Sequence, residues 1–149
     1  MTNKTRFLAF LLLCFLGSLM FANAQSMNKS FTGLAIKGYD PVAYFTERKP
    51  VKGDKAHRVK WRGANWDLSS AANPAAFKAA PEKYAPQYGG YCAWAMADGK
   101  TAKINPKQWS VVAGKLYLNF NADIQKKWSA DRANFITKAD AAWQKRSAK

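Results

Sequence analysis

The fold is decided by the stretch Pro81-Glu-Lys-Tyr-Ala-Pro-Gln-Tyr-Gly-Gly-Tyr-Cys-Ala-Trp-Ala-Met96. Its Gly89-Gly90 pair supplies the backbone freedom for a tight turn and for close aromatic packing. The composition of residues 91–97 then predicts a short helix, which Asp98-Gly99 would end. The stretch also holds Cys92, the one cysteine that we expect in the mature protein. We therefore expect any chemical site of the protein at this turn and helix.

A hairpin is predicted before this stretch. In residues 56–62, the side chains of His57, Val59 and Trp61 alternate with basic residues. This two-residue period is typical of a half-buried strand. A glycine-containing turn separates it from a second short run at residues 65–69. The two runs together predict an antiparallel pair.

A second hairpin is predicted after the stretch. Residues 109–112 and 115–119 flank Ala113-Gly114, and this is the clearest hairpin pattern in the chain. Residues 101–104 are also predicted as a short strand, which Asn105-Pro106 would stop because proline cannot donate a ladder hydrogen bond.

Helices are predicted between and after the hairpins. Asn73-Pro74 indicates a helix start, with Asn73 as the cap and Pro74 at the first helical position. From Asn121 onward the apolar residues follow a helical period, with a bend or break near residues 129–131. The residues that share the apolar face are Ile124, Trp128, Phe135, Ala139 and Trp143. We predict an α+β fold with a small antiparallel sheet of hairpins, short helices and a C-terminal amphipathic helix.

The N-terminal residues 1–24 are predicted to be a signal peptide. Lys4 and Arg6 form a basic start, residues 7–21 are mainly apolar, and Ala22-Asn-Ala24 is a small-x-small cleavage site. The apolar run is short for a membrane span of about 20 residues. We therefore expect cleavage near Ala24, no stable membrane anchor, and a periplasmic or secreted protein.

The mature chain, residues 25–149, is long enough for one domain with its own core. It keeps 22 of the 24 basic residues and all nine acidic ones, which gives a net charge of +13. Such a charge favours anionic partners in general. Because no nucleic-acid recognition motif is present and export is predicted, we expect no nucleic-acid partner. The scattered lysines indicate a solvated basic surface.

Two motifs are distinctive when they occur together. The first is Gly38-Tyr-Asp-Pro-Val-Ala-Tyr-Phe45. The second is Trp61-x-Gly-x-x-Trp66-x-Leu-Ser-Ser-x-x-Asn73-x-x-x-Phe77-x-x-x-Pro81-x-x-Tyr84, and it runs on into Tyr-Gly-Gly-Tyr-Cys92-Ala-Trp-Ala. On these motifs the chain resembles the exported YHS-domain proteins, and the resemblance covers nearly all of residues 25–149.

The resemblance implies a single YHS-type domain of α+β fold, a kind of module often found beside metal-handling machinery. It also implies that metal-binding relatives carry cysteines where this chain has Ala43, Ser69 and Asn73. Two oxygen-bearing side chains and a methyl group do not replace soft thiolates. A zinc or mercury site of that kind therefore cannot be carried over to this sequence.

Cys92 and Met96 are the candidate ligands for a soft metal. Cys92 would lie at the start of its helix, where free N–H groups and the helix dipole favour a thiolate. Met96 is four residues further on and would share the same helix face. A thiolate and a thioether suit Cu(I) better than zinc or magnesium. Copper is therefore the first candidate cofactor.

Three aromatic residues and one histidine would complete such a site. Tyr88, Tyr91 and Trp94 would shield the bound ion from water and oxidant. His57 is the only histidine in the sequence. It would act as a third ligand, or as a base for Cys92.

Two other interpretations use the same residues. Cysteine and methionine are common core residues, so Cys92 would be structural and the aromatic turn would line a pocket for a small molecule or a protein partner. The third interpretation is a thiol-dependent enzyme or redox protein. The sequence has no orienting Asn or Asp at a recognisable position and no cysteine-hydrolase signature, so a binding role is favoured over an enzyme.

Overall fold

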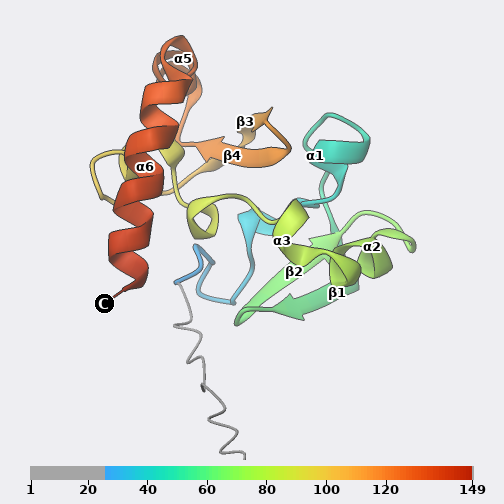
Figure 1. Cartoon of the computed structure of the whole chain (residues 1–149). Helices are drawn as coiled ribbons and strands as arrows, with labels where there is room; N and C mark the ends of the chain where they lie inside the picture. The colour runs from blue at the N-terminus through green and yellow to red at the C-terminus, as the bar shows by residue number, and fades with distance from the viewer. Residues whose placement is uncertain (1–25, 149) are drawn as a thin grey trace, which may run out of the picture.

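The computed structural model describes residues 26–148, which form an α+β arrangement of two hairpins and several helices (Figure 1). The predicted signal peptide lies outside the described residues. The strands are β1 (Asp54–Trp61), β2 (Ala64–Leu68), β3 (Asn105–Val112) and β4 (Lys115–Asn119). The α-helices are α1 (Ala43–Thr46), α2 (Asn73–Ala79), α3 (Pro81–Tyr84), α4 (Ala93–Met96), α5 (Ala122–Ala130) and α6 (Arg132–Ser147), and two 3₁₀ turns are η1 (Ile36–Gly38) and η2 (Tyr88–Gly90).

Both predicted hairpins are confirmed as antiparallel pairs. In β1–β2, Val59 lies opposite Trp66, and a register shift precedes this point. In β3–β4, Trp109 lies opposite Leu118. The two hairpins do not join into the one small sheet that the sequence suggested, because in the described residues each is a separate two-stranded sheet.

The predicted strand at residues 101–104 is wrong, and β3 instead begins at Asn105 and includes Pro106. Proline is tolerated there because the register shifts between Asn105 and Trp109, where no regular ladder bond needs its missing N–H. Residues 101–104 form a loop whose Ala102 carbonyl accepts a hydrogen bond from the Cys92 N–H at 3.1 Å.

The short helices begin or end at residues other than those predicted. Helix α2 carries Pro74 in its first turn as predicted. Asn73 does not cap the helix: it is the first helical residue, its side chain accepts no helix N–H, and its amide donates to Asp40 Oδ2. Helix α4 has four residues, with Cys92 at its N-cap position, and is shorter than the predicted helix at 91–97. The predicted break near residues 129–131 is confirmed at Asp131, whose φ of −144° and ψ of 47° separate α5 from α6.

Two clusters of buried residues make up the core. The first joins the two hairpins and includes Trp66, Phe77 and Leu118. The second lies under α6, and four residues of the predicted apolar face, Trp128, Phe135, Ala139 and Trp143, pack into it. The fifth, Ile124, packs instead against the first cluster. Figure 1 shows α6 along one side of the molecule, the β1–β2 hairpin on the other, and β3–β4 between them.

One buried carboxylate connects three parts of the first cluster. The Asp40 side chain is 0% exposed. Its Oδ1 accepts hydrogen bonds from the backbone N–H groups of Val42 at 2.7 Å and Ala43 at 3.4 Å. Its Oδ2 accepts from the Ser69 N–H at 2.7 Å, the Ser69 hydroxyl at 2.6 Å and the Asn73 amide at 2.6 Å. Asp40 therefore links the turn before α1, the end of β2 and the start of α2.

We expect Asp40→Asn to lower the free energy of unfolding by about 3 kcal/mol, because one acceptor oxygen becomes an NH₂ group that faces buried donors. Urea unfolding of the mature chain followed by tryptophan fluorescence measures this change. Asp98→Asn is the matched control, since Asp98 is exposed, and it should change stability by no more than about 0.5 kcal/mol. Equal effects of the two substitutions would contradict the role given to Asp40.

Candidate functional site

The two predicted sulfur ligands are both sealed from solvent. Cys92 is 1% exposed and Met96 is 0% exposed. They lie one turn apart on α4, and the Met96 N–H donates to the Cys92 carbonyl at 3.1 Å. Their side chains belong to different core clusters, however, with Cys92 in the first and Met96 in the second. The structure thus places both residues in the core and does not gather them at a common pocket.

The Cys92 thiol is part of a buried polar network. Its Sγ donates to Asn119 Oδ1 at 3.5 Å, and the Trp94 N–H donates to the same oxygen at 3.0 Å. The Asn119 amide donates to Gln125 Oε1 at 2.8 Å, and Gln125 Nε2 donates to the Ser110 hydroxyl at 2.8 Å. The network joins α4 to both strands of the second hairpin and to α5. Sequence reasoning missed it, because its members are far apart along the chain.

The fold does not place His57 beside Cys92 or Met96. It lies half-buried on β1, in the hairpin that Figure 1 places away from α6. Among residues 26–148, no hydrogen bond joins His57 to Cys92 or to Met96, and no three His, Cys, Asp or Glu side chains gather as a metal-binding group. The geometry therefore offers no third ligand from His57 and no Cys–His pair.

The three predicted shielding aromatics pack into the protein. Tyr88 is 3% exposed, and its hydroxyl donates to Asp140 Oδ1 at 2.8 Å. Burial, and then this hydrogen bond, raise the pKa of Tyr88 above its ordinary value. Trp94 lies 6.4 Å from the Phe135 ring centroid, and Tyr91 packs at the edge of the same cluster. These contacts tie the turn to α6.

The turn η2 has an unusual backbone. Tyr88, Gly89 and Gly90 all have positive φ, of 58°, 61° and 79°. A Cβ at Gly89 would clash with the Ser26 carbonyl and press on the Trp143 ring. This confirms that the glycine pair serves turn dihedrals and close aromatic packing. Tyr88 is one of six described non-glycine residues with positive φ, a strained backbone conformation.

The strained turn forms part of a pocket of about 310 Å³. Its aromatic lining comes from Trp61, Tyr88 and Trp143. The remaining lining residues are Met27, Arg62, Glu82, Ala85, Pro86, Gln87, Gly89 and Lys115. An aromatic-lined pocket at this turn was one of the sequence hypotheses, but of the aromatic residues predicted there only Tyr88 lines it, and Tyr91 and Trp94 do not. The contributions of Trp61, Trp143, Arg62 and Lys115 were missed, because they come from distant segments and carry no local motif.

Positively and negatively charged side chains line this aromatic pocket. The Arg62 guanidinium stacks 4.7 Å from the Trp61 ring centroid and is paired with the Glu82 carboxylate at 2.8 Å. Lys115 is exposed, and the described residues show no ion pair for it. Two cations and one anion leave a net positive charge beside aromatic surfaces.

The positions at which the predicted YHS resemblance implies cysteines, Ala43, Ser69 and Asn73, lie together in another part of the fold. Ser69 and Asn73 both donate to Asp40 Oδ2, and the Ala43 N–H donates to Asp40 Oδ1. These three residues therefore lie together in the fold, around a hydrogen-bonded carboxylate. No soft ligand remains there.

Comparison with known proteins found no match for this chain among family models, curated proteins or solved structures. The YHS resemblance therefore stays a prediction from the two sequence motifs. None of the helices within residues 26–148 is both long enough and apolar enough to cross a membrane.

We expect Cys92 in the folded mature chain to resist iodoacetamide and to be alkylated only in urea, because its side chain is 1% exposed. Intact mass spectrometry counts the modified thiols over time. As a control, Ala141→Cys places a thiol at an exposed site on α6, and this thiol should be alkylated at once without urea. Rapid alkylation of Cys92 in the folded protein would show that the thiol is accessible.

Proposed function

We propose that this protein is an exported YHS-type binding module, that its aromatic-lined pocket holds a small organic ligand, and that Cys92 is a structural residue. Export and the YHS assignment rest on the sequence motifs. The observation that supports a binding role is the pocket at η2, where Trp61, Tyr88 and Trp143 meet beside a strained turn. Concave sites with aromatic walls and a few polar groups are typical of ligand pockets.

The turn is held firmly before any ligand arrives. The Asn28 N–H donates to the Gly89 carbonyl at 2.8 Å, and the Asn28 amide donates to the Gly90 carbonyl at 2.8 Å. On the other side, the Gln87 N–H donates to the Leu116 carbonyl of β4 at 2.8 Å. Because these bonds fix the backbone in advance, a ligand would lose little free energy in ordering the site.

The lining indicates the chemistry of the ligand. Trp61 and Trp143 give the pocket aromatic surface, which suits a flat ring. Arg62 is neutralised in part by Glu82, whereas Lys115 has no carboxylate within 4 Å among the described residues. We infer a ligand with a flat apolar part and one anionic group, which Lys115 and Arg62 would contact.

The copper and thiol-enzyme hypotheses are less well supported by this geometry. A Cu(I) site at Cys92 and Met96 would need both sulfur atoms at one point, but they pack into different clusters. A nucleophilic thiol needs access and a nearby base, whereas Cys92 is buried and its thiol is hydrogen-bonded to Asn119. A structural role for Cys92 accounts for both observations.

The pocket is tested with indole-3-acetate and indole as a matched pair of probes. In ¹⁵N-labelled protein we expect indole-3-acetate to shift the indole N–H signals of Trp61 and Trp143, while the signal of fully buried Trp128 stays in place. Lys115→Gln should weaken indole-3-acetate binding about fivefold, which is the size of one exposed ion pair, and should leave indole binding unchanged.

Lys126→Gln is the charge-matched control, because Lys126 is exposed on α5 outside this pocket. It should leave the binding of both probes unchanged. Signal shifts that spread over the surface, with no larger shift for Trp61 and Trp143, would contradict ligand binding in this pocket.

A Cu(I) titration distinguishes a structural Cys92 from a copper ligand. If Cys92 is structural, anaerobic Cu(I) titration against a competing chelator should give the same weak uptake for the mature chain and for the Cys92→Ser and Met96→Leu variants. Met96→Leu conserves the core volume, so it still tests the copper site if Cys92→Ser fails to fold. A one-to-one Cu(I) complex that both substitutions abolish would replace the structural role of Cys92 with a copper site.

A further inference from the structure

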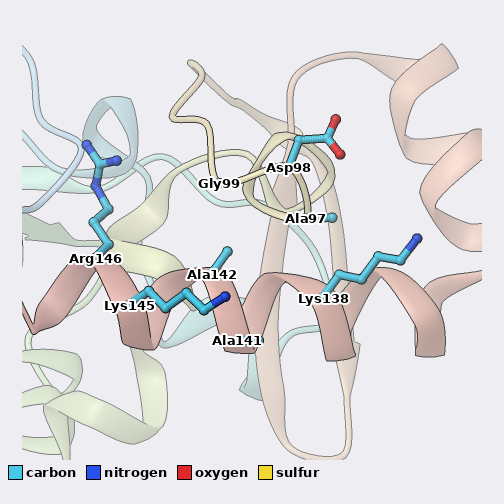
Figure 2. Close-up of a pocket in the computed structure, with 8 residues that line it drawn as sticks. All are labelled: Ala97, Asp98, Gly99, Lys138, Ala141, Ala142, Lys145 and Arg146. Atoms are coloured by element: carbon cyan, nitrogen blue, oxygen red, sulfur yellow. The ribbon is translucent and has the colours of Figure 1, made fainter.

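A second hollow, of about 590 Å³, lies between α6 and the turn that follows α4 (Figure 2). We call it the α6 groove. Its lining residues are Ala97, Asp98, Gly99, Lys138, Ala141, Ala142, Lys145 and Arg146. None of them lines the aromatic pocket, so the two hollows are separate sites.

The apolar surface of the α6 groove consists of small residues. Gly99 ends the α4 turn with a φ of 70°, and a Cβ placed on it would lie 4.0 Å from Ala142. Ala97, Ala141 and Ala142 carry only methyl groups. Because no long apolar side chain fills the space, the backbone of a bound segment can approach α6 closely.

The charged residues of the α6 groove are mostly basic and carry no ion pair. Lys138, Lys145 and Arg146 are all exposed. Within residues 26–148, no carboxylate lies within 4 Å of any of these three side chains. Figure 2 shows Lys138 and Lys145 projecting from separate turns of α6, with Asp98 on the facing turn. Three cations and one anion give the groove a net positive charge that would attract an anionic partner.

We propose that the α6 groove is a docking site for an acidic segment of a partner protein, bound as a polyproline II helix. The charge complementarity of the three unpaired cations favours a segment rich in Asp or Glu. The hollow shape favours a chain segment over a flat membrane surface, because a segment can lie in the hollow along α6, beside the point where Gly99 and Ala142 pack together. This proposal concerns a second site and does not depend on the ligand of the aromatic pocket.

The spacing of the two lysines predicts the spacing of the acids. Lys138 and Lys145 are seven residues apart, which is about 10.5 Å along a helix. In a polyproline II helix three residues make one turn and advance about 9 Å, so side chains three residues apart point the same way, whereas in a β-strand they would point to opposite faces. We therefore infer that the acidic side chains of the bound segment are three residues apart, as in Glu-Ala-Ala-Glu.

Fluorescence anisotropy of two labelled peptides tests this proposal. One peptide carries Glu-Ala-Ala-Glu between Gly-Ser flanks, and the other has the same composition with the two glutamates adjacent. We expect the mature chain to bind the spaced peptide more tightly, by about threefold. Lys138→Gln combined with Lys145→Gln should weaken that binding about tenfold, because two exposed ion pairs are lost.

Two further variants distinguish binding in the α6 groove from general electrostatic attraction to the basic surface. Lys126→Gln combined with Lys127→Gln removes the same charge from exposed positions on α5 and should leave binding unchanged. Ala141→Trp keeps the charge but fills the groove, and it should also weaken binding; Ala141 is exposed, so the fold tolerates the larger side chain. Equal losses from the two lysine pairs, or full binding by Ala141→Trp, would overturn the proposal.

Anionic lipid vesicles test whether a membrane surface is the partner of the α6 groove. We expect phosphatidylglycerol vesicles to bind the wild type and the Lys138→Gln, Lys145→Gln variant to nearly the same extent, since many scattered lysines contribute to contact with a flat surface. If the vesicles bound through Lys138 and Lys145 while the spaced peptide did not bind, an anionic membrane surface would replace the acidic segment as the partner of the α6 groove.

Discussion

The first core cluster depends on the buried carboxylate of Asp40. A charge taken out of water without partners costs several kcal/mol, so it persists only where donors surround it. Here five hydrogen bonds from Val42, Ala43, Ser69 and Asn73 replace the lost water. Those donors lie on three different segments. The need to satisfy one charge therefore fixes the position of α1, β2 and α2 relative to one another, and apolar packing around Trp66 fills the space that they enclose.

The same constraint acts at the three positions where the predicted YHS resemblance implies cysteines. A metal bound by three cysteines joins the segments that carry them. In this chain the corresponding positions, Ala43, Ser69 and Asn73, all donate to Asp40 instead. The hydrogen bonds join the same three segments, and this arrangement requires no metal. The metal chemistry implied by the resemblance thus has no ligand set at these positions, and the search for function moves to other parts of the surface.

Local patterns predicted the parts of the fold that depend on neighbouring residues. The two hairpins, the apolar face of α5 and α6 and the break at Asp131 all follow from periods and turn residues that the sequence displays. Tertiary contacts decided the rest. Asn73 was expected to cap α2, but it is the first helical residue, and its amide N–H donates to the Asp40 carboxylate. Cys92 and Met96 were expected to share a site, but α4 has only four residues, and its two ends face different clusters. The walls of the aromatic pocket meet only in the folded chain.

The two proposed sites share α6. Trp143 lines the aromatic pocket, while Ala142, Lys145 and Arg146 line the α6 groove. The strained turn is joined to the same helix, because Tyr88 donates to Asp140 and its ring lies 6.3 Å from that of Trp143. A ligand that moved the turn would therefore act directly on the helix that forms one wall of the groove. Any such coupling must be reciprocal, so an acidic segment bound along α6 would change the affinity of the pocket by the same factor. If α6 has a single position in both states, the two sites bind independently, since coupling requires an element with two arrangements.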